Sequence, residues 1–439
     1  MNYDTVIYNG TVITLNPDSD IVEKGVVCIR EGKIDGIYQQ KAGEELPKSP
    51  EKIDAEGGII MPGLVNTHCH MPMTLFRGLA DDLPLSQWLE EHIFPAEARH
   101  INPESVYWGT MLACAEMLLS GITACCDGYF LENHVAQAVQ EMGIRAVLGQ
   151  GIIDFPAPGV PRPEENVKHA KEFIQKWQNI SPLIQPSLFC HSPYTCSART
   201  LQKAKETADE MNVLFQIHAA ETKWEREQMI REKGMSPIAY LHSLGIPDEN
   251  TLLVHCVWTD AEDIDIIAES GAAVSHNPGS NMKLASGIAP VPDFLKAGIR
   301  VGLGTDGCAS NNNLDLFQEM DMAAKLHKVS TGDPTVMNAR TVLQMATLAG
   351  ARSVGLGDRT GSLEVGKAAD IIIADTEQPH LQPLYDPVSH LVYSADGSDV
   401  RDVLVAGKVL VKNRKLCSAD MGKIMEKMLE TAKSIREER

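Results

Sequence analysis

A repeated alternation of short apolar runs and longer helix-like stretches most constrains how this chain folds. Apolar runs separated by helical segments are typical of a parallel sheet that helices bury on both faces. The runs occupy eight segments: 58–70, 121–130, 144–154, 182–195, 212–221, 251–260, 271–281 and 298–307. Helical patterns lie between them, for example at 104–120, 133–142, 164–179, 199–211, 225–244 and 260–270. Eight such units favour an α/β fold with a closed (β/α)₈ TIM barrel over an open, doubly wound sheet.

Both ends of the chain are instead rich in short strand patterns. Asn9-Gly10 and the turn at 31–33 are hairpin signals near the N-terminus, and 369–375 and 400–416 repeat the pattern near the C-terminus. Two independent terminal hairpins are the alternative, but isolated hairpins are only marginally stable in water. The pattern therefore favours one small β-sandwich domain formed by both termini.

These patterns predict how the chain divides. The expected segments are the N-terminal part of the small β domain, the barrel, the C-terminal part of the small β domain and a final helix, at 1–58, 59–360, 361–419 and 420–439. In the last segment four apolar residues recur at helical spacing among charges: Met421, Ile424, Met428 and Ile435. We expect this helix to pack on the surface or at a subunit contact.

The charge balance limits the partners of the protein. Its 39 Lys and Arg residues stand against 59 Asp and Glu residues, which gives a net charge of −20. A surface this acidic repels nucleic-acid phosphates and anionic lipids. We therefore expect no nucleic acid and no membrane as partners, and the charge fits a protein that handles neutral or zwitterionic small molecules.

The cysteines and the N-terminal sequence bear on the compartment. The 10 cysteines are scattered without a CxxC pair, which indicates buried free thiols rather than disulfides. The first residues show no cationic region followed by an apolar stretch, and no window approaches the roughly 18 apolar residues that span a bilayer. We expect a cytoplasmic protein.

Two histidines one residue apart, His68 and His70, end the first apolar run. Residues i and i+2 of a strand point to the same side, so both would face the mouth of a barrel while Cys69 faces the helices. Taken alone, such a pair is as often a packing pair as a ligand pair.

Other polar residues end later strands. His218 with Glu221 ends the fifth run, His255 the sixth and Asp306 the eighth, while His191 and His276 end the fourth and seventh. Each of these residues could also have a purely structural role. His218 could be a hydrogen-bonded core histidine, and Asp306 could cap a helix. Active sites of TIM barrels lie at these strand ends. The conjunction of three histidines and one aspartate therefore favours a zinc or iron site over a structural polar cluster.

Such a set suits hydrolysis. Imidazoles and one carboxylate hold a divalent ion that lowers the pKa of water toward about 7. A nearby carboxylate must then move a proton to the leaving group. Asp306 and Glu221 are placed for this role, and His255 lies on the next strand, where it could orient the attacking oxygen.

Five segments of the chain resemble the amidohydrolase superfamily, in particular the branch of 5-methylthioadenosine/S-adenosylhomocysteine deaminases. They are "PGLVNTHCHMPMTLFRGLADDLPLSQWL" (62–89), "HAAE" (218–221), "VHC" (254–256), "LGTDGCASNNNLDLF" (303–317) and "GSLEVGKAADIIIAD" (361–375). The likeness covers nearly the whole chain. It implies a metal-dependent hydrolase on a (β/α)₈ barrel, and plausible homo-oligomers.

The resemblance also implies roles for single residues. His68, His70, His218 and Asp306 match the metal ligands, and Glu221 and His255 match the positions that transfer protons and orient the water. The substrate-binding positions are matched by four residues: Glu97, for the ribose hydroxyls, and His191, Glu221 and Arg162. Arg145 competes with Arg162 for that role. Glu97 could also be a solvated helix charge, and Arg162 could pair only with Glu164 or Glu165.

One departure from the wider superfamily is informative. Members with two metals bridge them with a modified lysine at the end of strand four, where this chain has "LFCHSPYT". The resemblance thus implies one divalent ion, most simply Zn²⁺ with Fe²⁺ as the alternative, and a deaminase. The expected reaction adds water to C6 of an adenosine derivative, namely 5′-methylthioadenosine, S-adenosylhomocysteine or adenosine, and releases ammonia and the 6-oxo product.

Two rival functions stay open. The same residues would serve a hydrolase of another N-heterocycle, such as guanine or a triazine. A catalytically silent metal-binding protein is the second rival, although such a protein has no use for a proton shuttle. The apolar stretch with Met71, Met73, Leu75, Phe76 and Trp88 could hold a thioether substituent or could equally be core packing.

Overall fold

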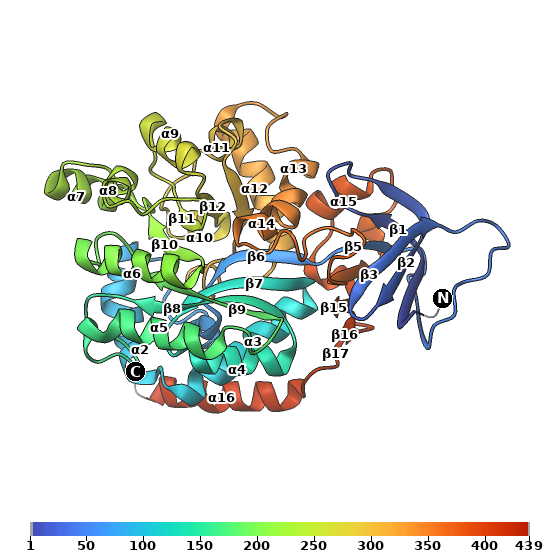
Figure 1. Ribbon diagram of the computed structural model, residues 1–439, viewed down its shortest axis with the longest axis horizontal. Coiled ribbons are helices and arrows are strands. Elements are labelled where there is room, and N and C mark those ends of the chain that lie inside the picture. Colours follow the sequence, from blue (N-terminus) through green and yellow to red (C-terminus); the bar gives the residue numbers. More distant parts are fainter. Residues whose placement is uncertain (1–2, 438–439) are drawn as a thin grey trace.

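The apolar runs in the middle of the chain form a closed parallel barrel (Figure 1). The computed structural model describes residues 3–437, and within them eight strands pair in sequence order. They are β6 (Leu64–Cys69), β7 (Ile122–Tyr129), β8 (Arg145–Ile152), β9 (Ile184–Cys190), β10 (Phe215–Ala219), β11 (Thr251–His255), β12 (Ala273–His276) and β13 (Arg300–Leu303). The last strand lies against the first, and the Asp306 N–H donates to the His68 carbonyl at 2.9 Å. The predicted TIM barrel is confirmed.

Helices cover the outside of the barrel (Figure 1). The α-helices are α1 (Leu85–Gln87), α2 (Phe94–His100), α3 (Pro103–Leu119), α4 (Glu132–Met142), α5 (Asn166–Trp177), α6 (Ala198–Met211), α7 (Lys223–Lys233), α8 (Pro237–Ser243), α9 (Ala261–Ser270), α10 (Pro278–Lys283), α11 (Val291–Lys296), α12 (Leu316–Thr331), α13 (Ala339–Met345), α14 (Leu348–Ser353), α15 (Pro387–Tyr393) and α16 (Met421–Glu437). Shorter helical turns are η1 (Met71–Phe76), η2 (Trp88–Ile93), η3 (Pro163–Glu165), η4 (Pro379–Leu381) and η5 (Gly397–Asp399).

The helix predicted at 225–244 is wrong as a single element. Gly234 ends α7 with a left-handed φ of 71°, and the Ser236 side chain accepts the Ala239 N–H to begin α8. Glycine in the left-handed conformation closes a helix because it has no Cβ to clash.

The first apolar run also divides. Its start is β5 (Ile59–Pro62), which pairs in the sheet of the two termini, and only its end is the barrel strand β6. Gly63 joins them where a side chain would lie 2.0 Å from Thr123 Oγ1, so the two sheets meet here at close range. The small sheet therefore extends past the expected limit at residue 58.

Strands from both ends of the chain share that second sheet, as predicted. Its members are β1 (Thr5–Ile13), β2 (Ile21–Arg30), β3 (Lys33–Gln39), β4 (Glu51–Asp54), β5, β14 (Ile371–Ala374), β15 (Val400–Val405), β16 (Lys408–Lys412) and β17 (Lys415–Leu416). Ile7 and Val27 share a buried apolar cluster with Ile371 and Leu404. The two ends therefore depend on each other for burial and do not form independent hairpins.

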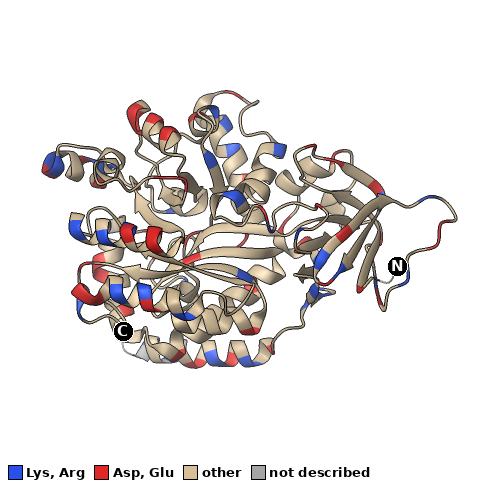
Figure 2. Ribbon diagram, in the orientation of Figure 1, with Lys and Arg blue, Asp and Glu red and all other residues tan. Residues whose placement is uncertain are grey.

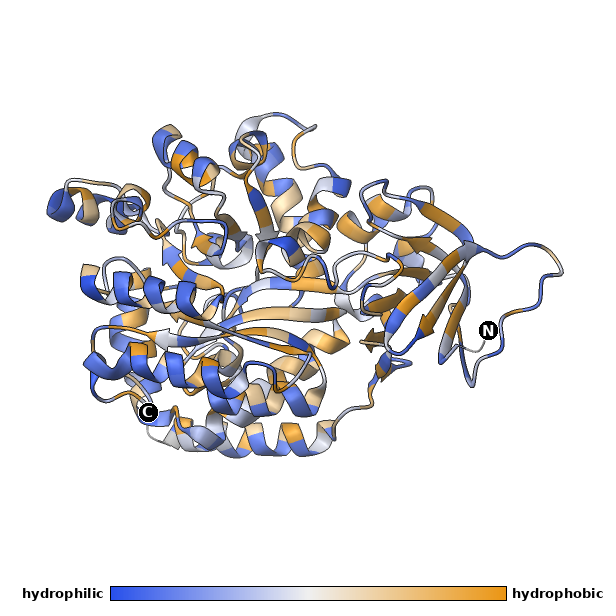
Figure 3. Cartoon of the chain, in the orientation of Figure 1, coloured by the Kyte–Doolittle hydropathy of each residue, from blue (hydrophilic) through white to orange (hydrophobic). Residues whose placement is uncertain are grey.

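The hydropathy of the ribbon follows this architecture. Barrel strands are largely hydrophobic, while charges concentrate on the surrounding helices (Figures 2 and 3). The final helix α16 lies against α3 and buries Ile424, Met428 and Ile435, as expected for a packed surface helix. Among the helices of residues 3–437, none is long and apolar enough to cross a membrane.

Candidate active site

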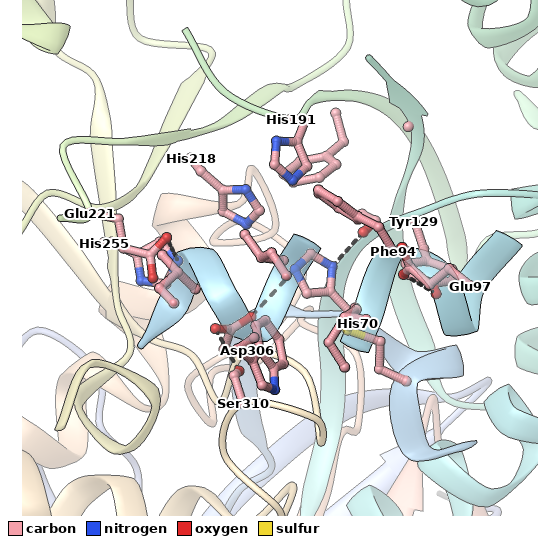
Figure 4. A pocket seen from close by; sticks show the side chains of 18 of the residues that line it. His70, Phe94, Glu97, Tyr129, His191, His218, Glu221, His255, Asp306 and Ser310 are labelled. Carbon is pink, nitrogen blue, oxygen red and sulfur yellow. Dashed lines mark hydrogen bonds and ion pairs between the residues drawn. The ribbon is translucent and has the colours of Figure 1, made fainter. Parts of the chain in front are cut away.

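Four potential metal ligands converge at the carboxyl ends of the barrel strands. The Nε2 atoms of His68 and His218 lie 3.2 Å apart, although β6 and β10 carry them from distant parts of the sequence. Asp306, just after β13, places its Oδ1 atom 3.4 Å from His68 Nε2 and 3.4 Å from His70 Nε2. Figure 4 shows His70, His218 and Asp306 facing one space. The structure thus brings together the four residues that the sequence singles out.

An irregularity in β6 helps to orient the histidines. Asn66 pairs with Cys125 and Cys69 pairs with Asp127, so β6 carries one residue more than β7 over this stretch. Such a bulge turns the strand and redirects side chains beside active sites. Cys69 lies as expected among the buried core residues, with its Sγ 3.5 Å from the Cys126 carbonyl oxygen.

The protonation of the cluster suits a cation. Burial lowers the pKa of His68 to about 3 and that of His218 well below its ordinary value, so both rings are neutral at pH 7. Burial opposes ionisation of Asp306, but the hydrogen bond to His68 and the nearby histidines hold its pKa well below the usual range. Neutral nitrogens at 3.2 Å beside a carboxylate oxygen match the ligand chemistry of a divalent ion such as zinc or iron.

Outer contacts fix the ligands in place. Ser280 and Ser310 hydroxyls donate to Asp306 Oδ2 at 2.6 and 2.9 Å, which leaves Oδ1 toward the histidines. His70 Nδ1 lies 2.6 Å from the Gly128 carbonyl oxygen, so this nitrogen carries the proton and Nε2 is left as a ligand atom. The two serines were not predicted from the sequence, where their only signal is their position after strands seven and eight.

His255 and Glu221 stand beside the cluster. His255 Nδ1 lies 2.9 Å from Asn281 Oδ1, and its Nε2 lies 3.9 Å from Glu221 Oε2. Burial raises the pKa of Glu221. A carboxyl group that holds its proton more tightly than usual is suited to donate one to a substrate.

Glu225 holds the backbone at Glu221, and the sequence analysis did not predict this role. Its carboxylate accepts the Ala220 N–H at 2.9 Å and the Glu221 N–H at 2.8 Å. A signal existed, because Thr222 and Glu225 have the T-x-x-E spacing that begins many helices. Glu319 has a similar supporting role after strands seven and eight. Its carboxylate accepts the Gly279 N–H at 2.9 Å and the Asn311 side-chain amide at 2.8 Å.

A cavity adjoins the cluster and is lined by the predicted substrate residues Glu97 and His191. Burial raises the pKa of Glu97 to about 7, although the Tyr129 hydroxyl donates to its carboxylate. His191 Nδ1 lies 3.0 Å from Thr195 Oγ1, and burial lowers its pKa to about 4. The sequence did not single out Tyr129, whose only signal is its place at the end of β7.

The rest of the cavity is mainly apolar. Its wall includes Leu85, Trp88, Leu89, Ile93, Phe94, Phe130, Tyr194 and Leu284. The stretch after His70 divides between the cavity wall and the core. Met73 and Trp88 line the cavity, whereas Met71, Leu75 and Phe76 are buried in the core without lining it.

The structure does not bring the predicted arginine into the cavity. Arg162 has a side chain 67% exposed and pairs with Glu165 at 2.7 Å. Its competitor Arg145 is buried at the start of β8, where it forms two hydrogen bonds to Asp370, of 2.8 and 3.1 Å. Arg162 thus forms the ion pair with Glu165 that was the alternative to a substrate contact. Arg145 links the barrel to the terminal sheet.

His276 is also outside the cluster. Its Nε2 lies 3.1 Å from His327 Nε2, and both rings are buried. The end of the seventh strand therefore contributes to the site through Ser280 and Asn281, which follow it, rather than through its histidine.

Fold and site together define a barrel hydrolase of the amidohydrolase type. The chain belongs to the Amidohydrolase family, whose model matches residues 59–410. It is therefore a hydrolase that acts on C–N bonds.

Similar proteins cover the chain from end to end. A 5-methylthioadenosine/S-adenosylhomocysteine deaminase of Syntrophobacter fumaroxidans is 46% identical over 433 residues, which are 99% of this chain and 98% of the relative. A 5′-deoxyadenosine deaminase of Methanosarcina mazei is 46% identical over 435 residues, 98% of each chain. The crystal structure of an adenosine deaminase from Xanthomonas campestris with bound zinc is 37% identical, with a TM-score of 0.97 and 99% of each chain covered.

Proposed function

We propose that the protein is a metal-dependent deaminase of adenosine derivatives, which converts them to the 6-oxo nucleoside and ammonia. The observation that carries this proposal is that Glu97 lines the same cavity as the His and Asp cluster. Figure 4 shows Glu97 and Tyr129 on one side of His70, with Glu221 and His255 on the other. A nucleoside needs such a cavity, because its base must reach the reacting groups while its ribose hydroxyls meet an acceptor. The names of the relatives support the same substrate class.

His68, His70, His218 and Asp306 would hold one divalent ion. Zinc is our first choice, supported by the zinc in the similar structure, and iron suits the same ligands. When bound, such an ion lowers the pKa of a water molecule toward about 7 and so activates it at neutral pH.

The protein's own residues would move the protons. As the water oxygen adds to C6 of the adenine ring, the Glu221 carboxyl donates a proton to ring nitrogen N1. Asp306 takes one water proton and passes it to the amine, the C6–N bond breaks, and ammonia leaves. The remaining water proton restores Glu221, so one water molecule is consumed for each ammonia. His255, held by Asn281, would orient the attacking oxygen.

Glu97 and His191 would bind the substrate. An ionised Glu97 can accept both ribose hydroxyls, while Tyr129 keeps its carboxylate in position. His191 is neutral at pH 7 and can donate or accept one hydrogen bond. The exposed ion pair of Arg162 gives no support to a contact with substrate.

The setting in the cell is part of the proposal. We propose a cytoplasmic homo-oligomer whose partners are small nucleosides and water, without nucleic acid or membrane. The ten cysteines, all free and nine of them buried, support a reducing compartment.

Ammonia release tests the proposed function. Metal-replete protein is incubated with 5′-methylthioadenosine, 5′-deoxyadenosine, S-adenosylhomocysteine and adenosine, with adenine and guanine as free-base controls. We expect ammonia and loss of adenine absorbance with at least one nucleoside. Turnover of guanine alone would favour the rival heterocycle hydrolase, and ammonia from none of the compounds would contradict the proposal.

A further inference from the structure

Apart from the proposed metal ion, the cavity is lined by acidic side chains and by no permanently cationic one. Among its described lining residues, the carboxylates are Glu97, Glu221, Glu225 and Asp306, and neither lysine nor arginine is present. The lining histidines whose pKa shifts are resolved, His191 and His218, are lowered by burial and are neutral at pH 7. Away from the proposed metal ion, an anionic group on a ligand would thus meet acidic side chains and no cationic one.

Several basic residues of the elements around the barrel already have acidic partners. Arg226 of α7 pairs with Asp260 and with Asp263, and Lys283 of α10 donates to Asp81 at 2.6 Å. The two arginines considered from sequence are paired with Glu165 and Asp370. Recruiting any of these cations to the cavity would break an existing ion pair.

The apolar wall lies next to the carboxylate proposed for the ribose. Ile93 and Phe94 precede Glu97 by four and three residues, spacings that place side chains on one face of a helix. Both line the cavity together with Leu85, Trp88 and Leu89, which come from the same segment. Phe94 extends this surface, with its ring centroid 5.6 Å from Phe155 and 6.2 Å from His191. A group attached to C5′ of the ribose therefore meets hydrocarbon first.

We infer that this chain selects adenosine derivatives with an uncharged, apolar 5′ substituent, such as methyl or methylthio, against those with an amino-acid substituent. This inference rests on the proposed function. A methylthio group gains from burial against the wall. The homocysteine part of S-adenosylhomocysteine carries an ammonium, which the acids can accept, and a carboxylate, which meets no cationic side chain at the apolar wall. Burying an unpaired carboxylate is strongly unfavourable.

The test compares kcat/KM for four nucleosides on the wild-type, metal-replete protein. They are 5′-methylthioadenosine, 5′-deoxyadenosine, S-adenosylhomocysteine and 5′-butylthioadenosine, whose substituent matches homocysteine in length without its charges. We expect the first two to exceed S-adenosylhomocysteine by about a hundredfold. The butylthio compound should lie within about tenfold of the methylthio compound.

Three outcomes separate the possible failures. S-adenosylhomocysteine used as well as 5′-methylthioadenosine would overturn the inference while leaving the deaminase intact. A butylthio compound as poor as S-adenosylhomocysteine would also overturn it, because length and not charge would then decide. Ammonia from none of the four would instead contradict the proposed function.

A variant adds the missing cation. Leu89→Arg places a guanidinium on the wall, and Leu89→Gln is the control of increased polarity without charge. We expect the arginine variant alone to raise the ratio of kcat/KM for S-adenosylhomocysteine over 5′-methylthioadenosine by about tenfold. An equal change in both variants would count against a charge effect. If Leu89→Arg does not fold, the wild-type comparison still decides.

Discussion

The two ends of the cavity are built in different ways. At the polar end, His68, His218 and Asp306 come from three separate strand ends, and hydrogen bonds from neighbouring elements fix several of the side chains there. At the apolar end, Leu85, Trp88 and Phe94 come from one continuous segment that packing holds in place. A change in that segment can alter which substituent fits without moving a metal ligand. If the proposed function holds, chemistry and selectivity are therefore separable in this fold.

Removing a ligand at the polar end should have the largest effect. His68→Ala deletes the imidazole that approaches both His218 and Asp306. We expect loss of bound metal and a fall in kcat of at least about a thousandfold. Metal analysis and ammonia release check this, and a His68→Ala protein that keeps both would show that the cluster is not the reacting centre.

Changing the proton donor should lower the rate and spare the metal. Glu221→Gln keeps the shape of the side chain but cannot deliver a proton. A fall in kcat of about 10²- to 10⁴-fold is expected, with metal content unchanged. Equal kcat in the variant and the wild type would remove Glu221 from the chemistry.

Glu97 lines the cavity between its polar and apolar ends. The ionisation of its carboxyl group should make KM depend on pH. Burial raises its pKa to about 7, so the carboxyl is protonated below that pH and ionised above it. Only the ionised form accepts both ribose hydroxyls, and KM for the nucleoside should therefore fall as the pH rises through about 7. Glu97→Gln should remove this pH dependence of KM and raise KM roughly 10- to 100-fold at higher pH, equivalent to about 1.5–3 kcal/mol. An unchanged profile would show that Glu97 does not bind the ribose.

Cys69 should matter least, despite lying between two ligands. Its thiol is buried toward the core, so Cys69→Ala should retain metal and stay within about twofold of wild-type activity. The cavity left behind should lower the unfolding free energy by about 1 kcal/mol. Loss of metal from this variant, measured beside His68→Ala, would mean that the division of roles in "NTHCH" is wrong.

The sequence predicted what topology decides. Parallel strands of one barrel end on the same rim, so His68, His218 and Asp306 had to approach each other once their strands were recognised. The extra residue in β6 was not foreseen, because a bulge depends on pairing with β7. Glu225 and Tyr129 were not predicted because their roles arise from hydrogen bonds that form only in the folded chain. The position of Arg162 outside the cavity was not predicted for a related reason. The position of a loop side chain depends on partners that sequence spacing does not reveal.

Reconstitution with zinc tests whether turnover depends on one bound metal ion. Protein freed of metal with a chelator is titrated with zinc while ammonia release from 5′-methylthioadenosine is followed, and bound metal is measured at each step. We expect no turnover without metal, recovery that saturates at about one ion per chain, and one ammonia for each 6-oxo product formed. Full turnover by metal-free protein, or none at any zinc loading with any adenosine derivative, would contradict a metal-dependent deaminase.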